Sequence, residues 1–379
     1  MDKKLLFLVN VDWFFISHRL PIALKAIEEG YDVHVACCDT GACEKLVEAG
    51  ITVHRINFSR AGNSIFRELL TLYRVFKVIR SLNPSILHSV TIKPVLYSGL
   101  ILRFFRDPPA YVAAISGLGY AFSASTFRSR LIKGVVSLLY KAALSHSRVK
   151  VIFQNKSDEL TLKSIVSLPE QNVTLIKGSG VDLHKYKAIA RSSFGSIKVV
   201  MASRLLKEKG VYDFVEAARI VTKQDSDIQF ILAGPIDQYN PNGISAEEIQ
   251  HWDSEGLIKA VGQCNDIPQL FASSDIVTLP SYYGEGLPKV LIEAAACGCP
   301  IITTDNPGCL DAVIPEQTGL VVPAKDPVRL AEAILRLANS PAERVAMGLA
   351  ARRFAVEEFD VDSVVSKHLS IYLELAEDC

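Results

Sequence analysis

The chain has 379 residues, of which 49% are hydrophobic and 22% are charged, a composition typical of a folded globular protein and unlike that of a disordered one. This length exceeds what one hydrophobic core usually fills, so two domains are expected. The eight cysteines form no C-x-x-C pair or framework spacing, which favours free thiols. No apolar run reaches the roughly 18 residues of a membrane span. The apolar start, interrupted by Asn10 and Asp12, predicts a buried strand rather than a signal peptide.

The formal net charge of zero hides an uneven distribution along the chain. Residues 1–180 hold 23 Lys and Arg against 13 Asp and Glu, whereas residues 181–379 hold 18 against 28. Most of the positive excess lies between Arg60 and Lys150. A basic first half indicates an anionic partner, either a membrane surface or a nucleic acid.

Short continuous apolar runs alternate with helix-length segments in both halves. Such runs are typical of parallel strands that are covered on both faces. In chain order, the expected strands are 5–9, 33–36, 52–56, 85–88, 111–114, 149–153, 173–176, 197–202, 228–233, 258–261, 276–279, 301–303 and 320–322. The pattern predicts two doubly wound α/β domains in tandem.

Between the two sets of strands, the chain loses its periodicity and gathers Gly and Ser, which is typical of a linker. We therefore expect one domain at 1–180, a linker at 181–196, a second domain at 197–360, and a C-terminal helix within 361–379 that packs back towards the first domain. Ligands of open α/β sheets bind at the carboxyl ends of the strands. Two such domains facing each other would form a cleft, with a donor on one wall and an acceptor on the other.

The segment E-G-L-P-K-V-L-I-E places Glu285 and Glu293 eight positions apart. Gly286-Leu287-Pro288 is expected to start a helix, with Glu285 just ahead of it and Glu293 about two turns in. The two carboxylates could then hold opposite ends of an elongated polar ligand, while helix N–H groups face its anionic middle. A nucleotide sugar has this shape. Alternatively, Glu285 only complements the helix dipole and Glu293 is solvated.

A second candidate site is the segment A-S-R-L-L-K-E-K-G at 202–210. Arg204 follows the first strand of the acidic second domain, and Lys209 precedes the next helix. Cations at the carboxyl end of such a strand fit a phosphate ligand, Arg204 as a fork and Lys209 as a point charge. An ordinary surface helix start remains the alternative.

Weaker signals follow other strands. Gly262 and Gln263 end a strand and could bind a base or only form a turn. His18 follows the first strand, where a structural role is the commoner explanation, and Ser116 precedes a glycine turn that does not match G-x-G-x-x-G.

Together, the two cations and the glutamate pair resemble the signature of glycosyltransferase family four, retaining enzymes of the GT-B fold. The resemblance runs along almost the whole chain, through V-N-V-D-W-F-F-I-S-H-R-L-P, I-S-G-L-G-Y, V-I-F-Q-N, G-S-G-V-D, E-G-L-P and T-D-N-P-G-C. These motifs are similar to the bacterial branch that builds capsule, O-antigen, lipopolysaccharide and lipid-linked oligosaccharides. The implied fold is two tandem Rossmann-like α/β domains facing across a cleft.

The resemblance implies roles for particular residues. Arg204 and Lys209 would bind the donor diphosphate and stabilise the leaving group, Glu293 would hold the ribose hydroxyls, and Glu285 would contact the hexose near the reacting carbon. The remaining donor contacts would come from Gly262, Gln263, Gly286, Leu287 and Pro288. The first domain departs from the family pattern, with Ser116 where many members have histidine, so its candidates are Asp12, His18 and Ser116.

The implied reaction transfers a hexosyl group, with UDP and N-acetylgalactosamine suggested by the branch, to an undecaprenyl-diphosphate-linked saccharide. No metal or other cofactor is expected, because the two cations and the helix dipole supply positive charge. A front-face route, in which the departing phosphate helps to deprotonate the acceptor, would retain the anomeric configuration.

Other functions fit the sequence less well. A nucleotide-sugar 2-epimerase of the same fold is the alternative, but it would need carboxylate and histidine bases in the cleft. A nicotinamide-dependent oxidoreductase is disfavoured by the absence of G-x-G-x-x-G, and no nucleic-acid-binding motif accompanies the basic half.

The basic first half is therefore expected to meet an anionic membrane surface. Residues 64–80 place Ile65, Leu69, Leu72 and Phe76 on one helical face, with Arg67, Arg74 and Lys77 on another, and a second basic amphipathic stretch covers 128–144. Each cation near an anionic leaflet contributes about 1 kcal/mol. We expect a cytoplasmic protein held peripherally at the inner face of the membrane; a solvated face of a packed helix is the alternative.

Overall fold

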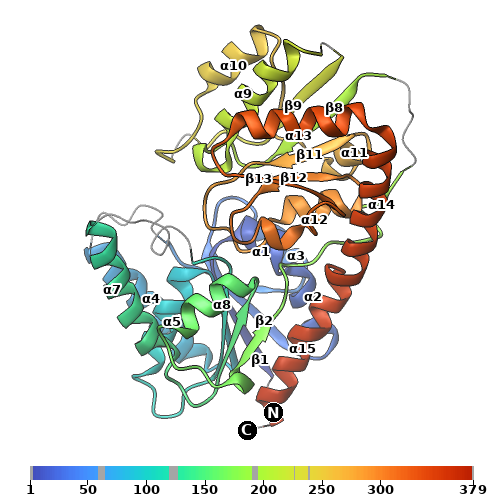
Figure 1. The fold of residues 1–379 in the computed structure, drawn as a ribbon. Helices are drawn as coiled ribbons and strands as arrows, with labels where there is room; N and C mark the ends of the chain where they lie inside the picture. Colours follow the sequence, from blue (N-terminus) through green and yellow to red (C-terminus); the bar gives the residue numbers. More distant parts are fainter. Residues whose placement is uncertain are drawn as a thin grey trace. The chain divides into compact units, whose positions relative to one another are not determined.

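The computed structural model describes residues 3–58, 65–118, 127–189, 195–225, 227–237 and 240–377, with the side chains of 127–133 and 377 left undescribed. The chain forms two compact units (Figure 1). Unit 1 comprises Met1–Ser179 and Asp362–Cys379, and unit 2 comprises Gly180–Val361.

Unit 1 contains a seven-stranded parallel sheet in the order β3-β2-β1-β4-β5-β6-β7. The strands are β1 (Lys4–Val11), β2 (Asp32–Cys38), β3 (Thr52–Arg55), β4 (Ile86–Val90), β5 (Ala110–Ile115), β6 (Val149–Phe153) and β7 (Val173–Leu175). The helices are α1 (Asp12–His18), α2 (Leu20–Glu28), α3 (Cys43–Glu48), α4 (Ile65–Leu82), α5 (Ile92–Leu102), α7 (Phe127–Leu144) and α8 (Lys156–Lys163), with a short helix η1 (Glu170–Asn172) before β7.

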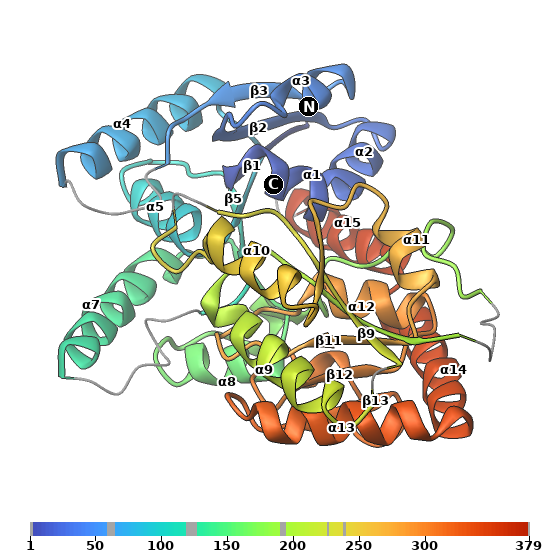
Figure 2. The same ribbon diagram turned by 90° about the horizontal axis from the view of Figure 1, so that it is seen from above.

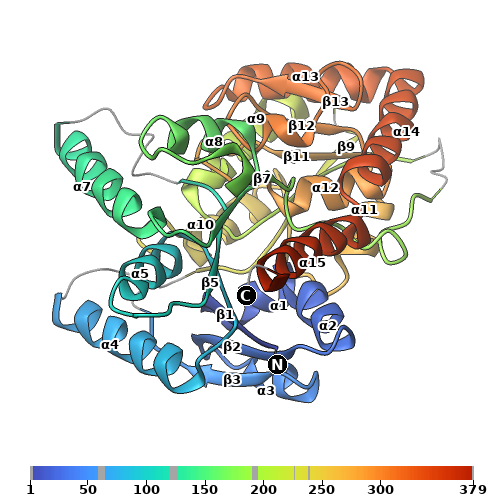
Figure 3. The ribbon, with the colours of Figure 1, turned by 90° about the horizontal axis from the view of Figure 1, so that it is seen from below.

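Alternate residues of β1 face opposite sides of this sheet, as strand geometry requires. Leu6 and Leu8 join a buried cluster with Val95 of α5, whereas the ring of Phe7 packs edge-on against Phe15 of α1, with centroids 5.2 Å apart. The helices are divided accordingly (Figures 1 and 3): α4, α5 and α7 cover one face, and α1, α2 and α15 (Val361–Glu377) cover the other. Both faces are therefore buried, which explains the continuous apolar strands.

The C-terminal helix α15 joins unit 1 through a buried polar cluster. The hydroxyl of Tyr372 lies 2.5 Å from Nδ1 of His88 on β4 in a hydrogen bond. The His368 ring stacks on the His88 ring, with centroids 5.7 Å apart, and its Nδ1 donates to the Val364 carbonyl over 2.8 Å. The guanidinium of Arg19 is buried in the same unit. Burial, followed by the nearby Arg19, lowers the pKa of His368 to about 3.

Unit 2 contains a six-stranded parallel sheet in the order β10-β9-β8-β11-β12-β13. The strands are β8 (Ile197–Ala202), β9 (Ile228–Ala233), β10 (Lys259–Gly262), β11 (Ile276–Leu279), β12 (Ile301–Thr304) and β13 (Gly319–Val322). The helices are η2 (Lys207–Lys209), α9 (Val211–Thr222), α10 (Ala246–Ser254), α11 (Ile267–Ala272), α12 (Lys289–Ala296), η3 (Leu310–Ala312), α13 (Pro327–Asn339) and α14 (Pro341–Glu358).

The segment expected to be a linker is largely part of unit 2 where the structure describes it. Val181 and Tyr186 are buried in the core of unit 2, and Val181 forms a parallel bridge with Asp360. Gly180 has a φ of +76°, and a Cβ there would lie 2.7 Å from the Val361 Cα. Residues 190–194 lie outside the described residues.

Among the described helices, none is both long and apolar enough to cross a membrane.

Candidate active site

The strand order of unit 2 reverses between β8 and β11. From β8 the chain continues outwards to β9, and from β11 it continues in the opposite direction to β12 (Figure 2). At such a point the loops after the two neighbouring strands diverge and leave room for a ligand at the carboxyl edge. Here those loops are residues 203–210 after β8 and residues 280–288 after β11.

These two loops are held together by backbone contacts. The N–H of Tyr282 donates to the Glu208 carbonyl over 3.0 Å, and the hydroxyl of Ser281 donates to the same carbonyl over 3.1 Å. Gly210 has a φ of +80°, and a Cβ at this position would lie 2.1 Å from the Pro280 carbonyl oxygen. The close approach therefore requires glycine at position 210.

Lys209 and Glu285 form an ion pair across these loops, between Lys209 Nζ and Glu285 Oε1. Their side chains are only 16% and 14% exposed. Ser281 Oγ donates a second hydrogen bond to Glu285 Oε1 over 3.0 Å. Two charges this far from water require such partners, so the pair fixes both side chains at the edge of the sheet.

Arg204 lies nearby on the loop after β8 and remains more accessible, with 45% of its side chain exposed. Its Nη1 lies 3.6 Å from Oδ2 of Asp237, which follows β9. Asp237 also lines a cavity of about 300 Å³ whose walls come from residues 236–247. The guanidinium is therefore loosely held and can move to an anionic ligand.

Glu293 lies in the second turn of α12, and its side chain is 12% exposed. Lys289 Nζ lies 3.7 Å from Glu293 Oε1, and Tyr186 makes a hydrogen bond with the same carboxyl group. Burial raises the pKa of Glu293, although Lys289 opposes this shift. The expectation that Glu293 lies about two turns into the helix is wrong, because α12 begins only at Lys289 and Pro288 is its N-cap.

The loop after β12 supports the segment that carries Glu285. Thr304 Oγ1 donates to the Ser281 carbonyl, and Asn306 Nδ2 donates to the Tyr283 carbonyl. A Cβ on Gly308, which has a φ of +82°, would lie 2.1 Å from the Gly286 carbonyl oxygen. The irregular backbone of 280–288 is thus fixed by neighbours far away in the sequence.

The remaining donor candidates of unit 2 lie along the same edge. Leu287 and Pro288 are buried beside Gly286 in the loop ahead of α12. Gly262 ends β10 with a φ of +63°, and both it and Gln263 are exposed. Since β10 is separated from β8 by β9, these two residues lie at the same edge of the sheet but two strands away from Lys209.

In unit 1, Asp12 is completely buried at the start of α1 and binds the loop after β2. Its carboxylate accepts hydrogen bonds from the N–H groups of Thr40, Ala42 and Trp13, each over 2.8 Å, and from the Thr40 hydroxyl. Burial raises the pKa of Asp12, but these hydrogen bonds outweigh it and hold the pKa below its ordinary value. These contacts join two loops of unit 1.

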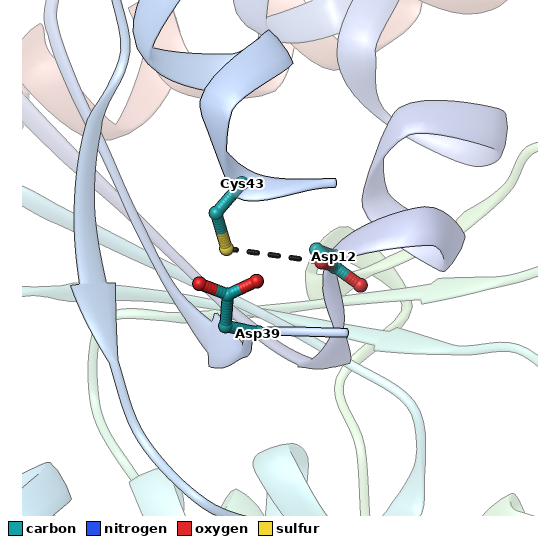
Figure 4. Close-up of side chains that lie close together, drawn as sticks. All are labelled: Asp12, Asp39 and Cys43. Carbon is teal, nitrogen blue, oxygen red and sulfur yellow. Dashed lines mark hydrogen bonds between the residues drawn. The ribbon is translucent and has the colours of Figure 1, made fainter. Parts of the chain in front are cut away.

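Asp39 and Cys43 lie beside Asp12, and Figure 4 shows the three side chains converging. Cys43 Sγ lies 3.8 Å from Asp12 Oδ2, and burial raises the pKa of the Cys43 thiol to about 11. Asp39 pairs with Arg55 over 2.7 Å. A protonated thiol and two carboxylates that already have partners form a poor cation site.

The other two candidates of unit 1 differ in their surroundings. The His18 ring stacks on Phe14, with centroids 4.2 Å apart, and its Nδ1 lies 3.2 Å from the Phe14 carbonyl oxygen. Ser116 follows β5, and its Oγ has no hydrogen-bond partner within the described residues.

Comparison with known proteins explains this arrangement. The family model of glycosyl transferases group 1 matches residues 185–354, and the glycosyl transferase 4-like model matches residues 4–155. The chain belongs to this glycosyltransferase family. The resemblance seen in the sequence is thereby confirmed, and the protein is an enzyme that transfers glycosyl groups.

Relatives of this glycosyltransferase act on lipid-linked or soluble sugars. It is 28% identical to the N,N'-diacetylbacillosaminyl-diphospho-undecaprenol alpha-1,3-N-acetylgalactosaminyltransferase of Campylobacter jejuni, over 94% of this chain and 97% of that one. Among solved structures, it resembles sucrose-phosphate synthase from Thermosynechococcus elongatus, with a TM-score of 0.80, 19% identity and 100% of both chains covered. Anabaena HepE in complex with UDP-glucose gives 0.75 and 18%, covering 97% and 99%. These structural matches confirm the expected GT-B fold.

Several residues of the glycosyltransferase site were missed in the sequence. Ser281 and Tyr186 contact Glu285 and Glu293 only through the tertiary fold, and Asp237 contacts Arg204 from a different strand. Each lies in a loop without a periodic pattern. The lysine four residues before Glu293 was the one detectable signal, because residues four apart on a helix are neighbours.

Proposed function

We propose that this glycosyltransferase moves a hexosyl group, with retention of configuration, from a UDP sugar to a lipid-diphosphate-linked saccharide of a surface polysaccharide. The Lys209–Glu285 ion pair at the switch point of unit 2 is the observation that carries the proposal. The printed activity of the Campylobacter jejuni relative supports N-acetylgalactosamine as the sugar and an undecaprenyl diphosphate as the acceptor carrier.

The donor diphosphate would bind at the loop after β8. A lysine ammonium has three N–H donors, and Glu285 takes one of those of Lys209, which leaves two for phosphate oxygens. Arg204 would exchange Asp237 for the diphosphate, because a guanidinium binds two phosphate oxygens at once. Glu293, kept in place by Lys289 and Tyr186, would accept the ribose hydroxyls.

Transfer would then proceed on one face of the donor sugar. The bond from the anomeric carbon to the donor phosphate breaks, and the acceptor hydroxyl oxygen bonds to the same face of that carbon. The hydroxyl proton passes to the departing phosphate oxygen. Lys209 and Arg204 stabilise the negative charge that develops on the leaving diphosphate, and Glu285 orients Lys209 and contacts the sugar.

The same two cations support a metal-independent reaction, with no other cofactor. We expect transfer to continue in the presence of EDTA, measured as label moving from a UDP sugar to lipid. A loss of transfer in EDTA that Mg²⁺ or Mn²⁺ restores would contradict this part of the proposal.

We further propose that helix α4 of unit 1 holds the enzyme peripherally at the anionic cytoplasmic leaflet. Leu72 and Phe76, expected on the lipid-facing side, instead pack against the core of unit 1. A different apolar set is exposed on α4, with exposed fractions between 40% and 82%: Ile65, Phe66, Leu69, Leu70 and Tyr73.

Charges on α4 favour an anionic partner for this apolar surface. Arg67, Arg74, Lys77 and Arg80 are exposed on the same helix, whereas its one carboxylate, Glu68, is neutralised by Lys93 at 2.8 Å. Apolar side chains flanked by cations are typical of a helix that lies in a membrane interface. Figure 2 shows α4 beside α5. The side chains of Arg128, Arg130 and Lys133 on α7, part of the second expected basic stretch, lie outside the described residues.

The transfer proposal is tested with labelled UDP-N-acetylhexosamines and a lipid diphosphate bearing one N-acetylhexosamine. Wild-type enzyme is expected to extend the lipid, and Lys209→Met to lose about 10²-fold or more of kcat. Lys207→Met is the matched control, because Lys207 is an exposed lysine of the same short helix η2. Equal activity in Lys209→Met and Lys207→Met would refute the assigned site.

The membrane proposal is tested separately by sedimentation with phosphatidylglycerol vesicles. Phe66→Asp combined with Leu69→Asp is expected to abolish binding, and high salt is expected to weaken it. The control pair Val345→Asp and Leu349→Asp changes residues of unit 2 that are 60% and 61% exposed. Binding that survives the α4 changes would refute this surface.

A further inference from the structure

Three polar atoms without partners lie at the carboxyl ends of three neighbouring strands of unit 1. Among the described residues, none makes a hydrogen bond with Asn10 Oδ1, Thr91 Oγ1 or Ser116 Oγ, and all three atoms are buried. Asn10 belongs to the end of β1, Thr91 follows β4, and Ser116 follows β5. These strands are adjacent in the order β1-β4-β5.

The strand register brings these residues into one row. Leu8 pairs with Ser89 between β1 and β4, so two further residues along each strand Asn10 lies opposite Thr91. Neighbouring strands are about 4.8 Å apart. The N–H of Thr91 donates to the Ala114 carbonyl over 3.2 Å, which places Ser116 only two residues beyond that contact. The row lies where the strand order of unit 1 reverses, between β1 and β4.

The backbone at Thr91 is strained. Its φ is +74° and its ψ is 166°, a region that is essentially restricted to glycine. A β-branched residue here is disfavoured in itself, and its hydroxyl gains no hydrogen bond in return. Such strain concentrates at sites where function requires a particular side chain.

The neighbouring backbone is held firmly on both sides of the row. Val95 N–H donates to the Thr91 carbonyl over 3.1 Å, and Leu118 N–H donates to Asp158 Oδ1 over 3.4 Å. Asn10, Thr91 and Ser116 are each half-buried, so part of every residue reaches the surface and a rotation about χ1 can turn its oxygen outwards. The row therefore consists of neutral hydrogen-bonding groups on a fixed frame.

We propose that Asn10, Thr91 and Ser116 bind the hydroxyl and acetamido groups of the acceptor saccharide. An amide oxygen and two hydroxyls both donate and accept hydrogen bonds with neutral partners, which suits a sugar better than a phosphate. This inference rests on the proposed function, because it names the site for the acceptor of that reaction. It assigns the row a binding role in unit 1 that is separate from the donor site of unit 2.

Thr91→Val is the informative change, because it keeps the β-branched shape and removes only the hydroxyl. If the hydroxyl binds no ligand, its removal leaves activity unchanged, since a buried group without a partner contributes no stability. If it binds the acceptor, the acceptor KM rises about tenfold, while the melting temperature and the donor KM stay the same. Thr91→Ser restores the hydroxyl and is expected to restore the acceptor KM.

Thr278→Val is the matched control. Thr278 lies on β11 of unit 2, and its Oγ1 is likewise buried without a partner within the described residues. This variant is expected to keep the wild-type acceptor KM. The measurements use UDP-N-acetylgalactosamine and a synthetic lipid diphosphate bearing one N-acetylhexosamine.

The outcomes separate this inference from the proposed function. A wild-type acceptor KM in Thr91→Val, in an enzyme that does transfer, overturns the acceptor site and leaves the proposed function standing. If the wild-type enzyme transfers to no lipid acceptor, the proposed function fails. Saturation-transfer NMR with free hexoses and N-acetylhexosamines then decides the sugar site: saturation that is lost in Thr91→Val supports it, and equal or absent saturation overturns it.

Discussion

The buried histidine on α15 predicts that unit 1 loses stability in mild acid. Burial and the nearby Arg19 lower the pKa of His368 from its ordinary 6.5 to about 3. Above pH 6.5, His368 is neutral in both the folded and the unfolded chain. Between pH 6.5 and 3, only the unfolded chain takes up the proton, so the free energy of unfolding falls as the pH falls.

The size of this loss follows from the shift. Each pKa unit corresponds to about 1.4 kcal/mol, so about 1.5 units between the ordinary pKa and pH 5 give about 2 kcal/mol from His368 alone. His88 adds to the loss, because burial first, and then His368 and Arg19, hold its pKa well below the ordinary value. His368→Gln should therefore reduce the loss by about 2 kcal/mol without abolishing it.

The two tryptophans of the chain allow unit 1 to be followed alone. Trp13 lies on α1 in unit 1, and Trp252 lies on α10 in unit 2. In a Trp252→Phe background, urea unfolding monitored by Trp13 fluorescence at pH 7 and pH 5 reports the stability of unit 1. His251→Gln is the control, because the His251 side chain is 66% exposed. An equal loss with pH in the His368→Gln and His251→Gln variants would refute the reasoning.

Three further predictions concern single residues. Gly308→Ala should lower kcat sharply while leaving most of the fold intact, because its Cβ would displace the backbone of Glu285; wild-type turnover would contradict this. Lys209→Met should destabilise unit 2 by about 3 kcal/mol by leaving Glu285 buried without a cation, and urea titration should show partial recovery in the double variant with Glu285→Gln. Asp12→Asn should cost about 2 kcal/mol, and because the pKa of Asp12 is lowered, its contribution is present above pH 3.8 and lost as the pH falls further; a variant as stable as the wild type at neutral pH would exclude a structural role for the hydrogen bonds to Thr40.

The strands were predictable because burial on both faces writes a continuous apolar run into the sequence. The segments 149–153 and 276–279 have the expected bounds in the structure, and every expected strand is present within one or two residues at its ends. The α/β class and the paired chemistry of Lys209 and Glu285 followed from such local patterns. The chain order of the strands also placed both residues near carboxyl ends of the sheet.

Tertiary contacts decided what the sequence did not reveal. The start of α12 is delayed to Lys289 because residues 280–288 are bonded to the loops after β8 and β12. Leu72 and Phe76 share a helical face with residues that remain exposed, and only the position of α5 shows which of them pack inwards. Asp12 offered a free carboxylate in the sequence, but its partners lie about 30 residues away, between Thr40 and Ala42.

The bridge between Val181 and Asp360 has a practical consequence. Because the chain enters and leaves unit 2 at neighbouring positions, residues 180–361 are an insertion whose two ends meet. A segment of this kind can be excised, or exchanged for the corresponding segment of a relative, with only two junctions to join. Chimaeras made at these junctions would offer a route to glycosyltransferases with a new choice of activated sugar and an unaltered recipient.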